Sequence, residues 1–140
     1  MDRALLIHLR GFMRRLLVAI VLAAGTLGAP GCVTPSIPIP PPDPALMTFS
    51  VQGTVGQTVA SFSYPIHPTL VDAVVFVYDR DKGEGVIKNA NPDGSVGPTP
   101  PLRADVGDQV VVSFQRDDQT ASTCVRLQDG AQSGTNYCDQ

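Results

Sequence analysis

From residue 48 onward, short segments alternate between apolar and polar side chains, a spacing typical of β-strands with one buried face. The segment TFSVQGTV, residues 48–55, places Phe49, Val51 and Val55 on one face. Helical spacing is absent from this part of the chain. The pattern predicts strands at residues 48–55, 58–64, 72–79, 85–90, 109–115 and 123–128.

One segment, DAVVFVYD at residues 72–79, is apolar and β-branched on both faces. We expect it to be the central and most buried strand of a sheet. Turn residues separate the strands, with NPDGS at 91–95 and GD at 107–108. The spacing predicts an all-β fold, a small β-sandwich of about seven strands. The expected core comprises Phe49, Val51, Ala60, Phe62, Tyr64, Val110, Val112, Phe114, Thr123, Val125 and Leu127.

The first 31 residues have the organisation of a secretory signal: a basic segment is followed by an apolar run at residues 16–29. This run is shorter than the about 20 apolar residues that a membrane-spanning helix needs. We therefore expect a signal helix that is cleaved off. An uncleaved membrane anchor is the alternative.

The charges are distributed unevenly about Cys32. Four basic side chains and one acid precede it, whereas six basic side chains and twelve acids follow it. The acidic body has no basic cluster that could neutralise phosphates, which argues against nucleic acid as its partner.

The sequence around Cys32, Ala29-Pro30-Gly31-Cys32, places small residues before a cysteine directly after the apolar run. This arrangement resembles the lipobox of bacterial lipoproteins. The resemblance implies cleavage before Cys32, a diacylglyceryl group on its thiol, and a fatty acyl chain such as palmitate on the new amino terminus. A thiol suits this reaction because its thiolate is a good nucleophile near neutral pH.

The chain has three cysteines, and two of them, Cys124 and Cys138, lie close together near the C-terminus. We predict a disulfide between these two, which an oxidising compartment permits. It would close a loop of about 15 residues and contribute roughly 3 kcal/mol. Cys32 is then the odd cysteine, and lipidation would give it a use. A free or intermolecularly paired Cys32 is the alternative.

Six prolines lie between residues 33 and 44, in VTPSIPIPPPDP. Proline fixes φ and lacks an amide donor, so this segment is expected to be an extended, polyproline-like stalk. At roughly 3.1 Å per residue, residues 33–46 would hold a domain about 40 Å from a membrane. A docking peptide for a proline-binding domain is the alternative. The expected division is a signal at 1–31, lipidated cysteine and stalk at 32–46, and a β-sandwich at 47–140.

The order VVFVYD, GVIKNANPDGSVG and LRADVGDQVVVSF resembles bacterial carboxypeptidase-regulatory-like or transthyretin-like modules, a branch of the Ig-like sandwiches. The resemblance covers about residues 50–116 and is carried by apolar strands and their turns. It implies an accessory, spacing or binding role, and it supplies no catalytic residues.

Candidate chemistry is sparse. Asp79, Asp81 and Glu84 lie in the loop DRDKGEG, whose spacing begins like that of a calcium site. Lys82 interrupts the series and no suitably placed glutamate follows, so we interpret the loop as a solvated hairpin tip. His67 is the one histidine after Cys32, which leaves little basis for zinc or histidine-dependent nucleophilic chemistry. No cofactor is expected.

The order of signal, Cys32, stalk and sandwich predicts a lipoprotein of the cell envelope that displays a non-catalytic domain. Its expected partners are the membrane, through the lipid, and an envelope protein or glycan. Val33 follows Cys32 where an aspartate would suggest inner-membrane retention, which favours the outer membrane. The alternatives are an enzyme or accessory module acting on envelope sugars or peptides, and a carrier of a small hydrophobic ligand.

Overall fold

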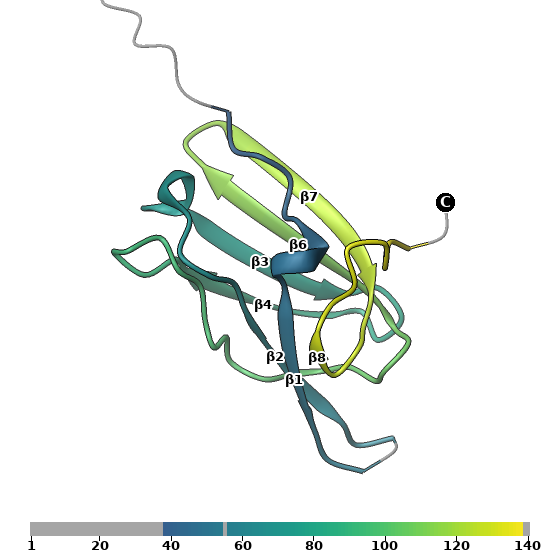
Figure 1. Ribbon diagram of the computed structural model, residues 1–140. Helices are drawn as coiled ribbons and strands as arrows, with labels where there is room; N and C mark the ends of the chain where they lie inside the picture. The colour runs from purple at the N-terminus through teal and green to yellow at the C-terminus, as the bar shows by residue number, and fades with distance from the viewer. Residues whose placement is uncertain (1–37, 55, 139–140) are drawn as a thin grey trace, which may run out of the picture. The chain divides into compact units, whose positions relative to one another are not determined.

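The computed structural model describes residues 38–54 and 56–138, and their regular secondary structure is β-strand apart from two short 3₁₀ turns (Figure 1). None of the helical turns among these residues is long or apolar enough to cross a membrane. The elements follow one another as η1 (Pro44–Leu46), β1 (Thr48–Gln52), β2 (Val59–Ser63), η2 (Pro68–Leu70), β3 (Val74–Asp79), β4 (Glu84–Asn89), β5 (Leu102–Arg103), β6 (Gln109–Arg116), β7 (Gln119–Arg126) and β8 (Gly130–Ala131).

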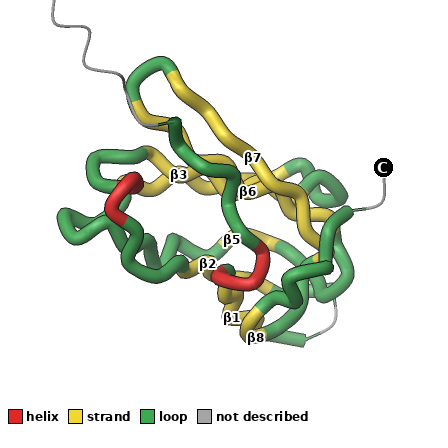
Figure 2. The backbone as a smooth tube through the Cα atoms, turned by 45° about the horizontal axis from the view of Figure 1, so that its top comes forward, coloured by secondary structure: helices red, strands yellow, loops and turns green. Residues whose placement is uncertain are grey.

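The strands form two four-stranded antiparallel sheets, which confirms the predicted β-sandwich (Figures 1 and 2). The first sheet has the order β5-β2-β1-β8 and the second has the order β4-β3-β6-β7. The longest pairing joins β6 to β7, from Gln109 opposite Arg126 to Arg116 opposite Gln119. Strand β3 lies between β4 and β6, as its apolar sequence predicts.

Side chains from both sheets meet in one apolar core. A row of aromatic rings crosses it: the ring centroids of Phe49 and Phe62 lie 5.2 Å apart, and those of Tyr64 and Phe114 lie 5.1 Å apart. Because Phe62 belongs to the first sheet and Phe114 to the second, this row joins the two layers. Such ring pairs contribute beyond their buried area.

Strand boundaries differ from the sequence prediction where turns or short pairings decide them. Strand β1 ends at Gln52, because Gly53 has a φ of 115°, which an L side chain rarely adopts. Strand β7 begins at Gln119 rather than at residue 123, because its polar first half continues the pairing with β6. Strands β5 and β8 each contain two residues, too few to give a periodic signal.

The outer face of β3 is more open than its sequence predicts. Val75, Val77 and Asp79 are buried, but Tyr78 on the other face is 46% exposed and Phe76 is half-buried. The expectation of burial on both faces is therefore wrong at Tyr78, while Val74 and Phe76 on the same face are partly covered.

Part of the expected stalk is packed against the sandwich. Ile39 belongs to the core, and Pro42 and Pro44 are buried. The Ile39 amide donates to Gln119 Oε1 at 3.0 Å, and Figure 1 shows the segment running from the β6–β7 hairpin to the start of β1. The folded unit therefore includes residues 38–46, before the expected boundary at Met47. Cys32, residues 33–37 and the expected signal helix lie outside the described residues.

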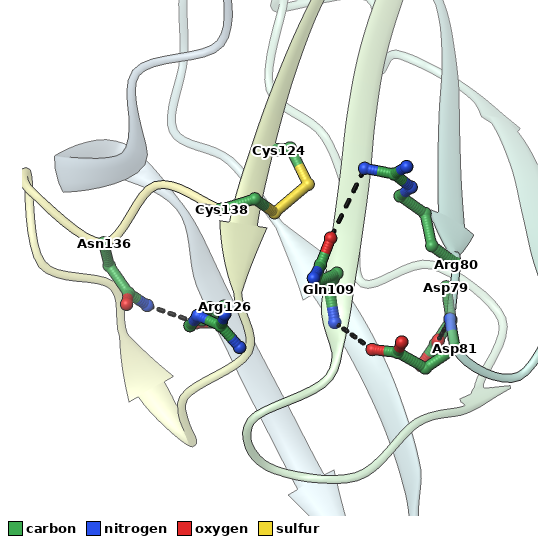
Figure 3. The surroundings of a disulfide bond; sticks show 8 residues. All are labelled: Asp79, Arg80, Asp81, Gln109, Cys124, Arg126, Asn136 and Cys138. Carbon is green, nitrogen blue, oxygen red and sulfur yellow. Dashed lines mark hydrogen bonds between the residues drawn. A yellow bond between two sulfur atoms is a disulfide. The ribbon is translucent and has the colours of Figure 1, made fainter. Parts of the chain in front are cut away.

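The predicted disulfide between Cys124 and Cys138 is present (Figure 3). It fastens the C-terminal segment to the outer edge of β7, where the Cys138 amide also donates to the Cys124 carbonyl at 3.0 Å. The Asn136 side chain donates to the carbonyl of Arg126 nearby. Covalent and hydrogen bonds thus hold the same segment, and the pairing accounts for two of the three cysteines in the chain.

Candidate functional site: the open face of the second sheet

The three acids of the loop DRDKGEG, whose spacing begins like that of a calcium site, have separate roles. Asp79 Oδ1 accepts hydrogen bonds from the amides of Asp81 and Lys82, at 2.8 and 2.9 Å. Asp81 Oδ2 accepts a hydrogen bond from the backbone amide of Gln109 at 2.6 Å, and Glu84 forms an ion pair with Arg103. Within residues 38–54 and 56–138, no group of three His, Cys, Asp or Glu side chains is arranged to hold a metal ion.

Two further acids, Asp105 and Asp108, lie beside this loop, and both are close to the ammonium group of Lys82. Lys82 Nζ lies 2.7 Å from Asp105 Oδ2 and 3.3 Å from Asp108 Oδ2. The hydrogen bond from Lys82, helped by one from the Thr58 hydroxyl, holds the pKa of Asp105 below its usual value. These contacts connect the β3–β4 hairpin to the β5–β6 turn, and Lys82 supplies the cation from within the chain.

Asp79 is the unusual member of the group. Its side chain is completely buried, and its Oδ2 atom has no hydrogen-bond partner. Burial raises the pKa of Asp79, and the neighbouring Asp108 carboxylate raises it further, against the lowering effect of the Lys82 and Asp81 amides. A raised pKa means that the folded state binds a proton more readily than the unfolded chain, so ionised Asp79 opposes folding.

We expect Asp79→Asn to raise the free energy of unfolding at pH 7 by about 1 kcal/mol. Asparagine keeps the Oδ1 acceptor for both amides and replaces the unpartnered oxygen with an NH₂ group that can donate to Asp108. The advantage should shrink as the pH falls through the raised pKa, because the wild-type carboxyl then becomes neutral too. Urea unfolding followed by circular dichroism at several pH values measures both effects. The exposed Asp118→Asn serves as control, and a variant less stable than the wild type at pH 7 would contradict the expectation.

His67 is held within its own loop. Its Nδ1 atom lies 2.7 Å from the Thr69 hydroxyl, and its amide donates to the Gly94 carbonyl at 3.2 Å. Both contacts stabilise the loop between β2 and β3, which supports a structural role for this histidine.

The outer faces of the two sheets differ strongly in chemistry. Strands β1 and β2 of the first sheet present the polar side chains Thr48, Ser50, Gln52, Ser61 and Ser63 together with Val59. The outer face of the second sheet, hereafter the open face, is largely apolar near its centre. By strand register it comprises Val74, Phe76, Tyr78, Arg80, Gly85, Ile87, Asn89, Gln109, Val111, Ser113, Gln115, Thr120, Ser122, Cys124 and Arg126.

Tyr78, on the open face, lies beside a glycine of the neighbouring strand. Gly85 is its cross-strand partner, and a Cβ atom there would lie 3.1 Å from Tyr78 Cδ2 and 2.9 Å from the Val77 carbonyl oxygen. The aromatic ring thus lies close against β4 at a position where any other residue would meet both the ring and the backbone. Val111 is its partner on β6, so the ring has an apolar neighbour there.

A groove of about 470 Å³ runs beside the disulfide, where the open face meets the C-terminal segment. Its walls include Arg80, Ser122 and Tyr137 along with the two cysteines and Pro41. Arg80 extends from the end of β3 toward Gln109, and its Nη1 donates to Gln109 Oε1 at 3.3 Å (Figure 3). The groove therefore combines a guanidinium group, a hydroxyl, and an aromatic ring that is 53% exposed.

No protein-family model, no curated protein and no solved structure matches this chain. The open face was not among the sites expected from the sequence. The sequence feature that marks it is the apolar character of residues 74, 76 and 78. The same feature also predicts a central strand that is buried on both sides.

Proposed function

We propose that this protein is a lipid-anchored component of the bacterial cell envelope whose β-sandwich is a non-catalytic binding module. The observation that carries the binding role is the open face: a surface with apolar and arginine side chains on a fold whose other outer face is polar. Large apolar patches on a protein surface often mark interaction sites. Lipidation at Cys32 and the outer membrane as its location belong to this proposal.

The disulfide supports the anchor because it pairs Cys124 with Cys138 and leaves Cys32 as the odd cysteine. The packing of residues 38–46 changes the geometry expected from the stalk. Six residue steps separate Cys32 from the first described residue, which permits a separation of at most about 20 Å. The proposed anchor would hold the sandwich close to the membrane surface.

We expect Cys32→Ser to move the protein from the membrane fraction to the soluble fraction, because the acyl chains that would anchor it are attached at this residue. The measurement is cell fractionation combined with the intact mass of the detergent-extracted wild-type protein. That mass should begin at Cys32, include the acyl groups, and rise by two protons on reduction. Ser36→Ala is the matched control and should stay in the membrane. A wild-type mass that begins at Met1, or a variant that remains in the membrane, would contradict the anchor.

A further inference from the structure

The open face has a charge distribution that differs from the rest of the domain. Eleven of the thirteen acids in the chain lie in the described residues, and none of these eleven is on the open face. Two of the six basic side chains described, Arg80 and Arg126, are on it. Among the described residues, the face therefore has arginine side chains and no carboxylate, a pattern complementary to an anionic partner.

We propose that the open face binds an extended polypeptide segment of a partner protein in which apolar side chains alternate with carboxylates. The inference rests on the proposed binding role and gives the partner a chemical class. In the proposed complex, a carboxylate of the partner binds Arg80, and the partner's apolar side chains pack against the centre of the face.

Arg80 is suited to this role by its surroundings. Lys82 and Arg103 have acids as ion-pair partners, whereas no described carboxylate lies within ion-pair distance of Arg80. The side chain is exposed, borders the groove beside the disulfide, and has one long hydrogen bond to Gln109. A guanidinium group can bind a carboxylate through two parallel hydrogen bonds, which fixes orientation as well as charge.

The apolar part of the face is contiguous with Arg80. Tyr78 precedes it by two residues on β3, and Phe76 lies opposite Ile87, which is 63% exposed. Gly85 beside Tyr78 has no side chain that would cover the ring, so the ring stays accessible to a partner. Aromatic and arginine side chains together are typical of protein–protein hot spots.

A polypeptide fits this combination better than a glycan does. Ile87 and Val111 are aliphatic and offer no hydrogen bonds to sugar hydroxyls, which would lose their water on contact. Leucine-like side chains would instead gain from covering the same surface. An extended segment also matches the scale of the groove, which accommodates a few side chains rather than a folded domain.

The test is fluorescence anisotropy with labelled peptides of about ten residues, more than enough to cross four strands at about 4.8 Å each. The probes alternate Asp with Leu, Lys with Leu, or Asp with Ser, and the protein is the full chain in nonionic detergent. We expect saturable binding of the Asp-Leu peptide below about 1 mM, and weaker binding of the other two. Arg80→Gln should weaken Asp-Leu binding roughly tenfold.

The matched control is Ser61→Glu, which changes net charge by the same amount on the outer face of the first sheet and should leave binding unchanged. Circular dichroism verifies that both variants are folded. Equal binding of the Lys-Leu or Asp-Ser peptide would overturn the inference, as would no binding or no effect of Arg80→Gln. Tighter binding of polygalacturonate, or of phosphatidylglycerol vesicles, would assign the face to a glycan or a lipid instead and would equally overturn it.

These outcomes are separate from the test of the anchor. If the protein fractionates with membranes through Cys32 but binds none of the three peptides, the anchor is supported and this inference is overturned. A soluble, unlipidated protein that selects the Asp-Leu peptide would retain the inference and lose the anchor.

Discussion

Phe62→Ala is expected to lower the free energy of unfolding by about 3–5 kcal/mol. Phe62 is completely buried on β2, an inner strand of the first sheet, and its ring lies 5.2 Å from that of Phe49. Alanine would leave a cavity in the aromatic row that joins the two sheets. Domains of this size have roughly 5–15 kcal/mol of stability, so the variant should be folded only marginally. Urea unfolding is best followed by circular dichroism or tyrosine fluorescence, because the chain has no tryptophan.

Phe76→Ala is the matched control for this experiment. It removes the same atoms from an inner strand of the second sheet, but Phe76 lies on the open face and is only half-buried. Its alanine variant should therefore lose clearly less stability than the Phe62 variant. Equal losses would mean that the second sheet is covered on both faces in solution, as the apolar sequence of β3 predicts.

Replacing both Cys124 and Cys138 with serine is expected to lower stability by about 3 kcal/mol and the melting temperature by on the order of 10 °C. The cysteines are 14 residues apart in sequence, and their bond restricts the unfolded chain. Thermal unfolding with and without a reducing agent measures the same difference in the wild-type protein.

The control for the disulfide is the pair Ser113→Ala and Ser122→Ala, which face each other on β6 and β7. Their hydroxyl groups lie 2.7 Å apart at an exposed position, so losing them should cost less than about 1 kcal/mol. Unfolding of the wild type that is insensitive to reducing agent, or a double serine variant as stable as the wild type, would contradict a stabilising disulfide.

The sandwich could be predicted because period-two alternation records which side of a strand is buried. Ala60, Phe62, Val110, Val112 and Phe114 were all expected in the core and are buried there. The disulfide followed from the proximity of the last two cysteines. Both inferences use local sequence and require no knowledge of how the sheets pack.

The open face could not be predicted because alternation is uninformative for a strand that is apolar on both sides. Residues 74–78 carry the same signal whether their second face is covered or open. The composition of this face depends on register, which brings Tyr78, Gly85 and Val111 together from three separate strands. Packing of Ile39 was equally hidden, since prolines predict an extended backbone but not the surface against which it lies.

Residues 38–46, the segment packed on the sandwich before β1, could extend the tether if they detached. Residues 38–46 contact the sandwich through buried side chains and side-chain hydrogen bonds, and none of the strand pairings involves them. Peeling these nine residues away would add about 30 Å of reach and leave both sheets paired. Under mechanical tension between the proposed anchor and a bound partner, residues 38–46 would detach before the strands of the two sheets separated.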